Sequence, residues 1–133
     1  MAERTVVVSQ PMFLPWLGLF EQVRLADVFV HYDDVQLPQG RSFMTRVQLK
    51  TSRGVVWLTA PIDRVRSGRT IRETRLMPAA TWRPKHLRSI RQALAGTPHA
   101  DMAMQLAERI YATDRKSTRL NSSHTVTRMP SSA

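Results

Sequence analysis

The stretch Thr5-Val6-Val7-Val8-Ser9-Gln10-Pro11 decides how the fold begins. Consecutive β-branched residues are typical of a short buried strand, and proline ends it because it has no N–H for a sheet ladder. A loop through Pro15 follows, and apolar residues at three- and four-residue steps predict a helix from Trp16 to Leu25. Residues 27–36 form the second expected strand. Strand, helix and strand in this order predict a parallel βαβ unit with a right-handed crossover.

The rest of the chain predicts a hairpin followed by helices. Residues 41–50 alternate apolar and polar side chains, and a turn containing Gly54 separates them from a second apolar run at 55–60. We expect this hairpin to extend the first sheet and residues 71–76 to add a short strand. Helices are expected at 82–95, with Thr81 as N-cap, and from Pro98 onward. The predicted fold class is therefore α/β: a mixed sheet with an N-terminal βαβ unit, a β-hairpin and C-terminal helices.

Composition limits the kind of protein. The chain has 133 residues, of which 42% are hydrophobic, and this suits one domain with a buried core. It contains no cysteine, which excludes disulfides, thiolate nucleophiles and cysteine-based metal centres. No apolar run is long enough for a signal peptide or a membrane span. We therefore expect a cytoplasmic protein without membrane insertion.

Residues 114–133 differ from the rest of the chain. Their sparse apolar residues follow neither the strand nor the helix period. Residues 114–124 resemble the in-frame translation of a common sequencing adapter, and residues 128–133 resemble its downstream part; a natural basic tail is the alternative. We expect residues 1–113 to be the N-terminal part of a truncated domain and residues 114–133 to be an artefactual or disordered tail.

Positive charge is concentrated in the middle of the chain. Residues 46–91 hold ten Arg and two Lys against Asp63 and Glu73, a net charge of +10. Such a surplus favours an anionic partner such as a nucleotide, nucleic acid or acidic glycan. Five of these ten arginines lie in residues 63–75, where no aromatic residue is interleaved. This speaks against nucleic acid, because a stacking platform for bases is not evident.

The loop after the first strand is the first candidate site. In open α/β sheets, ligands bind where strands end and helices begin. Ser9 and Gln10 supply hydrogen-bonding groups there, and Trp16 supplies a stacking face. The glycine-rich phosphate-loop motifs are missing. The alternative is a rigid turn held by its prolines, with its aromatic residues in the core.

Asp33 and Asp34, with Gln36, end the second expected strand. If the two strands are parallel neighbours, these side chains lie beside Gln10. A carboxylate there can act as a general base, bind an amino group or hold a divalent metal. The sequence offers too few further ligands for a metal, and no cofactor motif occurs. The alternative is a solvated turn, which Asp favours.

Two further candidates carry positive or titratable groups. Arg46 and Lys50 share one face of the expected hairpin and can clamp a phosphate or carboxylate; the alternative is an ordinary wet sheet face. His86 falls at the edge of an apolar helix stripe, where a histidine can act near neutral pH. The alternative for His86 is a structural role.

These residues resemble the WbqC-like protein family over residues 5–112. The resemblance is carried by the following blocks, in this order and spacing: Gln10-Pro11, Leu14-Pro15-Trp16-Leu17-Gly18, Asp33-Asp34-Val35-Gln36, Arg46 with Lys50, Trp57-Leu58-Thr59, and Trp82 with Lys85-His86. The chain departs from the family at Ser9, where His is usual, and at Thr45, where Asn is usual.

The resemblance implies a bacterial protein of surface-polysaccharide (O-antigen) biosynthesis. The implied activity is transfer of a glycyl or aminoacyl group to an amino sugar, with a nucleotide-sugar or an activated acyl donor as small-molecule partner and no cofactor. Asp33, Asp34 and His86 would then be catalytic, and Ser9, Gln10, Trp16, Gln36, Arg46 and Lys50 would bind substrate. Two alternatives are a non-catalytic module for an anionic partner and a structural protein of a polysaccharide assembly complex.

Overall fold

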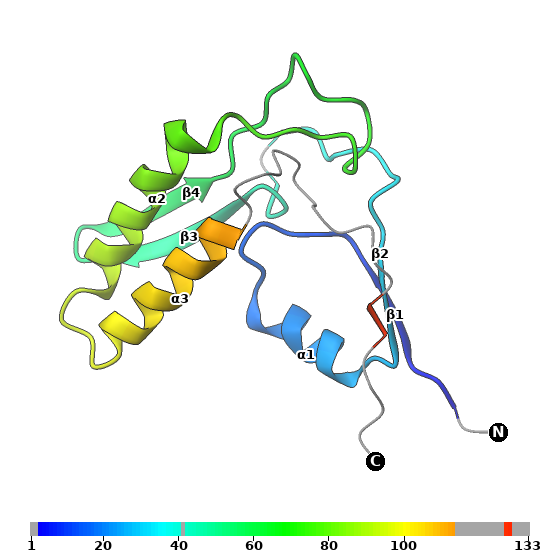
Figure 1. Ribbon diagram of the computed structural model, residues 1–133, viewed down its shortest axis with the longest axis horizontal. Helices are drawn as coiled ribbons and strands as arrows, with labels where there is room; N and C mark the ends of the chain where they lie inside the picture. Colours follow the sequence, from blue (N-terminus) through cyan, green and yellow to red (C-terminus); the bar gives the residue numbers. More distant parts are fainter. Residues whose placement is uncertain (1–2, 41, 114–126, 129–133) are drawn as a thin grey trace.

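Two small sheets and three helices make up the part of the chain that the structure describes, which is residues 3–40, 42–113 and 127–128 of a computed structural model (Figure 1). In chain order the elements are β1 (Val6–Ser9), α1 (Leu17–Leu25), β2 (Val28–His31), β3 (Arg46–Thr51), β4 (Gly54–Thr59), α2 (Ala79–Leu94), α3 (Ala100–Thr113) and β5 (Thr127–Arg128).

The expected βαβ unit is confirmed. Strands β1 and β2 pair in parallel, with a register that runs from Val6 opposite Val28 to Ser9 opposite His31. Helix α1 covers one face of this pair, where Leu19, Ala26 and Phe29 form a buried cluster. The other face is open, because the side chains of Val6 and Val8 are 56% and 59% exposed. Strand β1 is therefore only half-buried, on one face, and not buried on both faces as the apolar run predicted.

The hairpin does not extend this sheet, which corrects the sequence prediction. Strands β3 and β4 form a separate antiparallel pair, from Arg46 opposite Thr59 to Thr51 opposite Gly54. In the first sheet the strand order is β1-β2-β5, so β5 and not the hairpin pairs with β2. The hairpin instead packs against α2, and α3 lies beside α2 (Figure 1).

Two element boundaries differ from the prediction for local reasons. Strand β3 begins at Arg46 because the preceding residues form a turn, in which the Ser42 hydroxyl accepts a hydrogen bond from the Met44 N–H at 3.1 Å. In this turn Phe43 is 76% exposed, whereas Met44 and Thr45 are buried. Helix α2 begins before its expected cap, since the Thr81 hydroxyl donates to the Pro78 carbonyl from inside the first turn.

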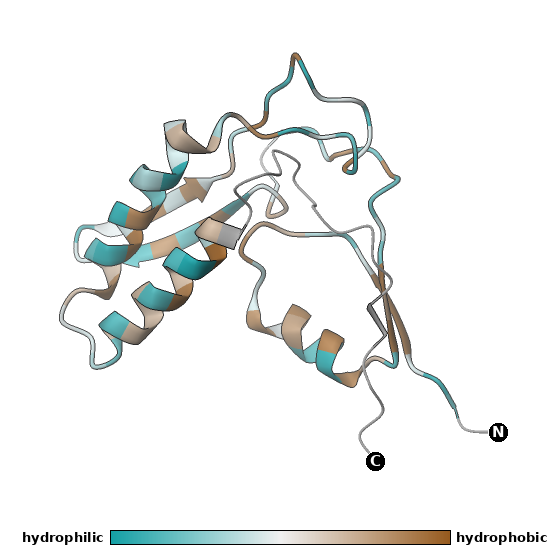
Figure 2. Cartoon of the chain, viewed as in Figure 1, coloured by the Kyte–Doolittle hydropathy of each residue, from teal (hydrophilic) through white to brown (hydrophobic). Residues whose placement is uncertain are grey.

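A second core joins the hairpin to the helices and to the loop after β1. Its buried residues are Ala60, Leu76, Trp82 and Tyr111, and Phe13 and Leu14 of that loop pack against them. Figure 2 shows hydrophobic residues along β1 and β2, whereas α2 and α3 carry both kinds of residue. The expected strand at 71–76 is reduced to one isolated bridge between Ile62 and Leu76. None of the helices in the described ranges has the length and apolarity needed to span a bilayer.

Ile71 tests whether the arginine-rich segment is part of the folded structure. Its side chain is fully buried, whereas that of Val65 in the same segment is 95% exposed. We expect Ile71→Ala to lower the free energy of unfolding by about 2–5 kcal/mol, because it leaves a cavity. The matched control Val65→Ala should change it by less than about 0.5 kcal/mol. Chemical denaturation measures both, and equal small effects would show that the segment is not packed.

Candidate functional site

Gln10 and Asp33 follow β1 and β2 at the same end of the first sheet, where both strands have their carboxyl ends. The Tyr32 N–H donates to the Ser9 carbonyl at 2.8 Å, which extends the parallel pairing just beyond β1 and β2. Gln10 is half-buried, Asp33 is buried and Asp34 is exposed. Both residues thus follow neighbouring strands at the same end of the sheet, with the Asp33 carboxylate buried and the Asp34 carboxylate turned to solvent.

The chain from Asp33 onward is held by the arginine-rich segment. Strand β2 ends at His31, not at Gln36 as expected. The Arg72 N–H donates to the Asp33 carbonyl and the Ile71 N–H to the Val35 carbonyl, both at 2.9 Å. Gln36 forms an isolated antiparallel bridge with Thr70. Because these backbone groups pair with residues 69–72, Asp33 sits between the sheet edge and the basic part of the chain.

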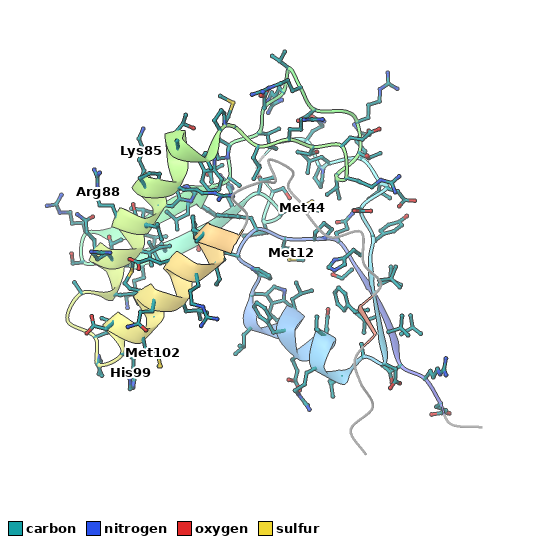
Figure 3. The ribbon with its side chains drawn as sticks, viewed as in Figure 1. Met12, Met44, Lys85, Arg88, His99 and Met102 are labelled. Atoms are coloured by element: carbon teal, nitrogen blue, oxygen red, sulfur yellow. The ribbon has the colours of Figure 1, made fainter. Side chains whose placement is uncertain are left out.

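The loop from Met12 to Trp16 separates two apolar hollows. One, of about 500 Å³, lies against the hairpin and is lined by Trp16, Phe43 and Gln48 as well as by the loop. The other, of about 600 Å³, lies against the helices, where Phe20 and Ile110 take part in its lining. Figure 3 shows Met12 and Met44 in the middle of the molecule, between the β1–β2 half and the hairpin half.

Leu14 takes a strained conformation in this loop. Its φ of +44° lies in the left-handed region, which a branched side chain rarely adopts, and the residue precedes Pro15. Such strain costs about 1–3 kcal/mol and persists only where surrounding contacts hold it. Here the Phe13 N–H donates to the Met44 carbonyl at 2.9 Å. Strained backbone of this kind is found preferentially at functional sites, which favours the loop as a candidate.

Trp16 covers Gly18, and this explains the spacing of the Pro-Trp-Leu-Gly block. A Cβ at Gly18 would overlap the six-membered ring of the Trp16 indole. Trp16 nevertheless remains 63% exposed, so its face is open to a ligand. Glycine at position 18 therefore lets the indole lie flat along the start of α1.

We expect Gly18→Ala to displace the indole of Trp16 without unfolding the chain. The added methyl group collides with the ring, while alanine in a helix is more favourable than glycine by up to about 1 kcal/mol. Tryptophan fluorescence should change, and the free energy of unfolding should fall by less than about 1 kcal/mol. In a Trp16→Phe background the same substitution should leave the fluorescence unchanged. An unchanged spectrum in the parent background would contradict this packing.

Arg46 and Lys50 lie near opposite ends of β3. The Arg46 guanidinium carbon lies 4.0 Å from the centroid of the Trp57 ring, a cation–π contact. Lys50 is exposed and lies opposite Val55, next to the hairpin turn. Four residues along a strand separate the backbones by about 13 Å. The phosphate clamp made by these two side chains stays a prediction, and the structure provides other cations for that task.

His86 is buried among aromatic rings on α2. Its Nδ1 lies 3.1 Å from the Tyr111 hydroxyl, and its ring centroid lies 5.8 Å from that of Phe13. Burial lowers the pKa of His86 below its ordinary value of 6.5, and a hydrogen bond with the Thr59 backbone raises it in part. Burial raises the pKa of Tyr111, so its hydroxyl stays protonated. This environment favours a neutral imidazole; the catalytic role of His86 stays a prediction.

The lowered pKa of His86 predicts a dependence of stability on pH. Below about pH 6.5 the unfolded chain binds the proton more readily than the folded chain, so the free energy of unfolding should fall as the pH drops from about 7.5 to about 5.5. His86→Gln should flatten this part of the profile. His99→Gln, at an exposed position at the start of α3 (Figure 3), should leave it unchanged. Urea titrations across this range measure the effect, and identical profiles for both variants would contradict it.

Comparison with known proteins confirms the family. The chain belongs to the WbqC-like protein family, which matches residues 10–128. It is 33% identical over 106 residues to the uncharacterized protein Rv1507c of Mycobacterium tuberculosis (strain ATCC 25618 / H37Rv). The aligned region is 78% of this chain and 45% of that protein, so the chain spans about half the length of the curated relative it matches. No solved structure matches the chain.

The family match passes the boundary expected at residue 113. It includes Thr127 and Arg128, which form β5 against β2, whereas residues 114–126 and 129–133 lie outside the described part of the chain. The division of the chain at 113 therefore stays a prediction.

Sequence reasoning missed several residues that line the hollows. Phe43 lies in the turn before β3, which no sequence pattern predicts, and Gln48 lies on β3 itself. Arg64 and Arg69 line a smaller cavity. The surplus of arginine in their segment indicated an anionic partner but not these two residues. Among the described residues no group of three or more acidic or histidine side chains is placed to hold a metal ion.

Proposed function

We propose that this chain takes part in transfer of a glycyl or other aminoacyl group to the amine of a nucleotide-linked amino sugar, in the cytoplasm and for bacterial surface polysaccharide. The observation that carries the proposal is the parallel pairing of β1 and β2, because Gln10 and Asp33 follow the ends of these two neighbouring strands. Family membership supports the general setting. Because the chain spans about half the length of its relative, the activity of a longer, complete protein is also proposed and not shown.

The chemistry needs a base and a hydrogen-bonding group at the reacting amine. The amine nitrogen of the sugar attacks the carbonyl carbon of the activated acyl group, a C–N bond forms, and the bond from that carbon to the leaving group breaks. The amine proton passes to the carboxylate of Asp33, and the leaving group departs with the electron pair. Gln10 can hold the sugar or the acyl carbonyl, because its amide both donates and accepts.

The hollow beside the loop suits a sugar. Aromatic faces pack on the apolar face of a pyranose, and an amide pairs with its hydroxyls. Trp16 and Phe43 provide such faces in the hollow of about 500 Å³, and Gln48 provides the amide. The hollow is therefore large enough for a sugar ring.

The experiment combines a binding measurement with a transfer measurement on the chain. A glycyl thioester and a uridine-diphosphate amino sugar are mixed with the protein, and mass spectrometry detects gain of one glycyl residue by the sugar. We expect Asp33→Asn to abolish transfer and to leave sugar binding and the circular dichroism spectrum intact, since only the proton acceptor is lost. We expect Asp34→Asn to abolish it as well if both carboxylates act.

Asp101→Asn, at an exposed position in the first turn of α3, is the matched control and should retain full transfer. Retained transfer in both the Asp33 and the Asp34 variants would remove these carboxylates from the mechanism. Absence of transfer by the parent chain would count against the proposed reaction.

A second candidate is a non-catalytic module for an anionic partner. The net charge of +10 over residues 46–91 favours it. A salt titration separates the two: binding of a nucleic acid weakens steeply with the logarithm of salt concentration, in proportion to the number of phosphates neutralised. A shallow dependence together with transfer favours the enzyme.

A further inference from the structure

A cavity of about 250 Å³ lies between residues 36–40 and the basic loop, which is residues 63–75. Its polar lining includes Gln36 and Gln39 from the first segment and Arg64, Ser67 and Arg69 from the basic loop. No carboxylate is among the residues that line it. The cavity is therefore positive and rich in hydrogen-bond donors, and it lies apart from the apolar hollows described above.

The basic loop is an ordered frame for this cavity. Ile71 and Thr74 are the most completely buried large side chains of the described residues. The Ser67 hydroxyl donates to the Asp63 carbonyl at 2.6 Å and accepts from the Arg75 N–H at 2.8 Å. The bridge between Gln36 and Thr70 ties the loop to the opposite wall. A frame held in this way keeps the cavity open without a ligand.

The acidic residues of the basic loop are occupied by structural bonds. The Asp63 carboxylate accepts from the Arg66 guanidinium at 2.5 Å. The Glu73 carboxylate accepts from the backbone N–H groups of Arg69 and Thr70 at 3.0 and 3.1 Å. These bonds hold the pKa of both carboxyl groups below the ordinary range, so both stay ionised and bound.

Glycine at position 68 permits this arrangement, because a Cβ there would overlap the Glu73 side chain. The Glu73 side chain turns into the loop, where its carboxylate accepts hydrogen bonds from backbone N–H groups. Within the described residues, neither the Arg64 nor the Arg69 guanidinium has a carboxylate within salt-bridge distance. Both side chains are exposed, and their charge is available to a ligand.

We propose that this cavity binds the phosphate or diphosphate group of a small-molecule substrate, with Arg64 and Arg69 as its cationic contacts. Arginine matches a phosphate through two parallel hydrogen bonds, which gives both strength and orientation. The volume is below the range of about 300–1,000 Å³ that holds a complete small-molecule ligand, so the cavity suits a charged group and not a whole nucleotide-sugar. Gln36 and Gln39 add amide donors.

This inference deepens the proposed function by locating the charged end of the nucleotide-linked substrate. The segment that carries Asp33 continues to Gln36, which lines the cavity. A diphosphate bound there would therefore contact the same segment that carries the proposed base. Binding of the anion does not itself depend on the transfer reaction.

The test is a titration of the 133-residue chain with inorganic diphosphate, in which calorimetry measures the heat of binding. The double variant Arg64→Ala/Arg69→Ala should weaken binding by about tenfold or more, since each charge-assisted contact is lost. The double variant Arg53→Ala/Arg88→Ala removes the same charge at exposed positions outside the cavity, and Figure 3 shows Arg88 directed away from α2. This control should bind diphosphate within about twofold of the parent chain, because only long-range attraction changes.

A third variant, Arg64→Lys/Arg69→Lys, keeps the charge and removes the planar fork, and it should bind with intermediate affinity. Circular dichroism checks that each variant is folded. Equal weakening in the two alanine pairs, a preference for long RNA over diphosphate, or no diphosphate binding by the parent chain would each overturn the inference. Diphosphate binding with the expected pattern but without aminoacyl transfer would leave this inference standing and remove the proposed function.

Discussion

The structure depends on Phe13, which joins the half that contains β1 and β2 to the half that contains the hairpin and helices α2 and α3. The Phe13 N–H donates to the Met44 carbonyl, and its ring lies 6.2 Å from that of Trp82 and 5.8 Å from that of His86. One residue of the loop after β1 is thus bonded to the turn before the hairpin and packed on helix α2. Since β1 and β2 form their own sheet and β3 and β4 another, contacts of this kind fix the candidate site relative to the second core. The strained backbone at Leu14 is the local cost of placing that ring.

The sequence predicted the elements better than their assembly. Three β-branched residues before a proline, and an apolar run after Asp27, predicted the parallel pair, and with it that Gln10 and Asp33 follow adjacent strands. Alternation alone could not show that the hairpin forms a separate sheet, because it predicts a strand but not the strand with which it pairs. Nor could alternation show the turn before β3, in which the Met44 N–H donates to the Ser42 hydroxyl and Phe43 is exposed.

Charge illustrates a second limit of sequence reasoning. The count of arginines predicted an anionic partner, but it could not say which of them remain available. That depends on where the carboxylates are used: Asp63 pairs with Arg66, and Glu108 pairs with Arg91. Glu73 instead accepts backbone N–H groups, which is possible because Gly68 has no side chain. The acidic residues of the basic loop order that loop, and the positive surplus is left on the walls of a cavity.

The tryptophans are distributed so that each reports on a different part of the molecule. The sequence has only three. Trp82 is buried in the second core, Trp57 lies under the Arg46 guanidinium on the hairpin, and Trp16 is the most exposed, above the start of α1. Intrinsic emission is therefore a composite of three local environments. A neutral quencher added in steps would extinguish the signal of the loop first and that of the second core last, which makes the chain its own optical probe of order in each region.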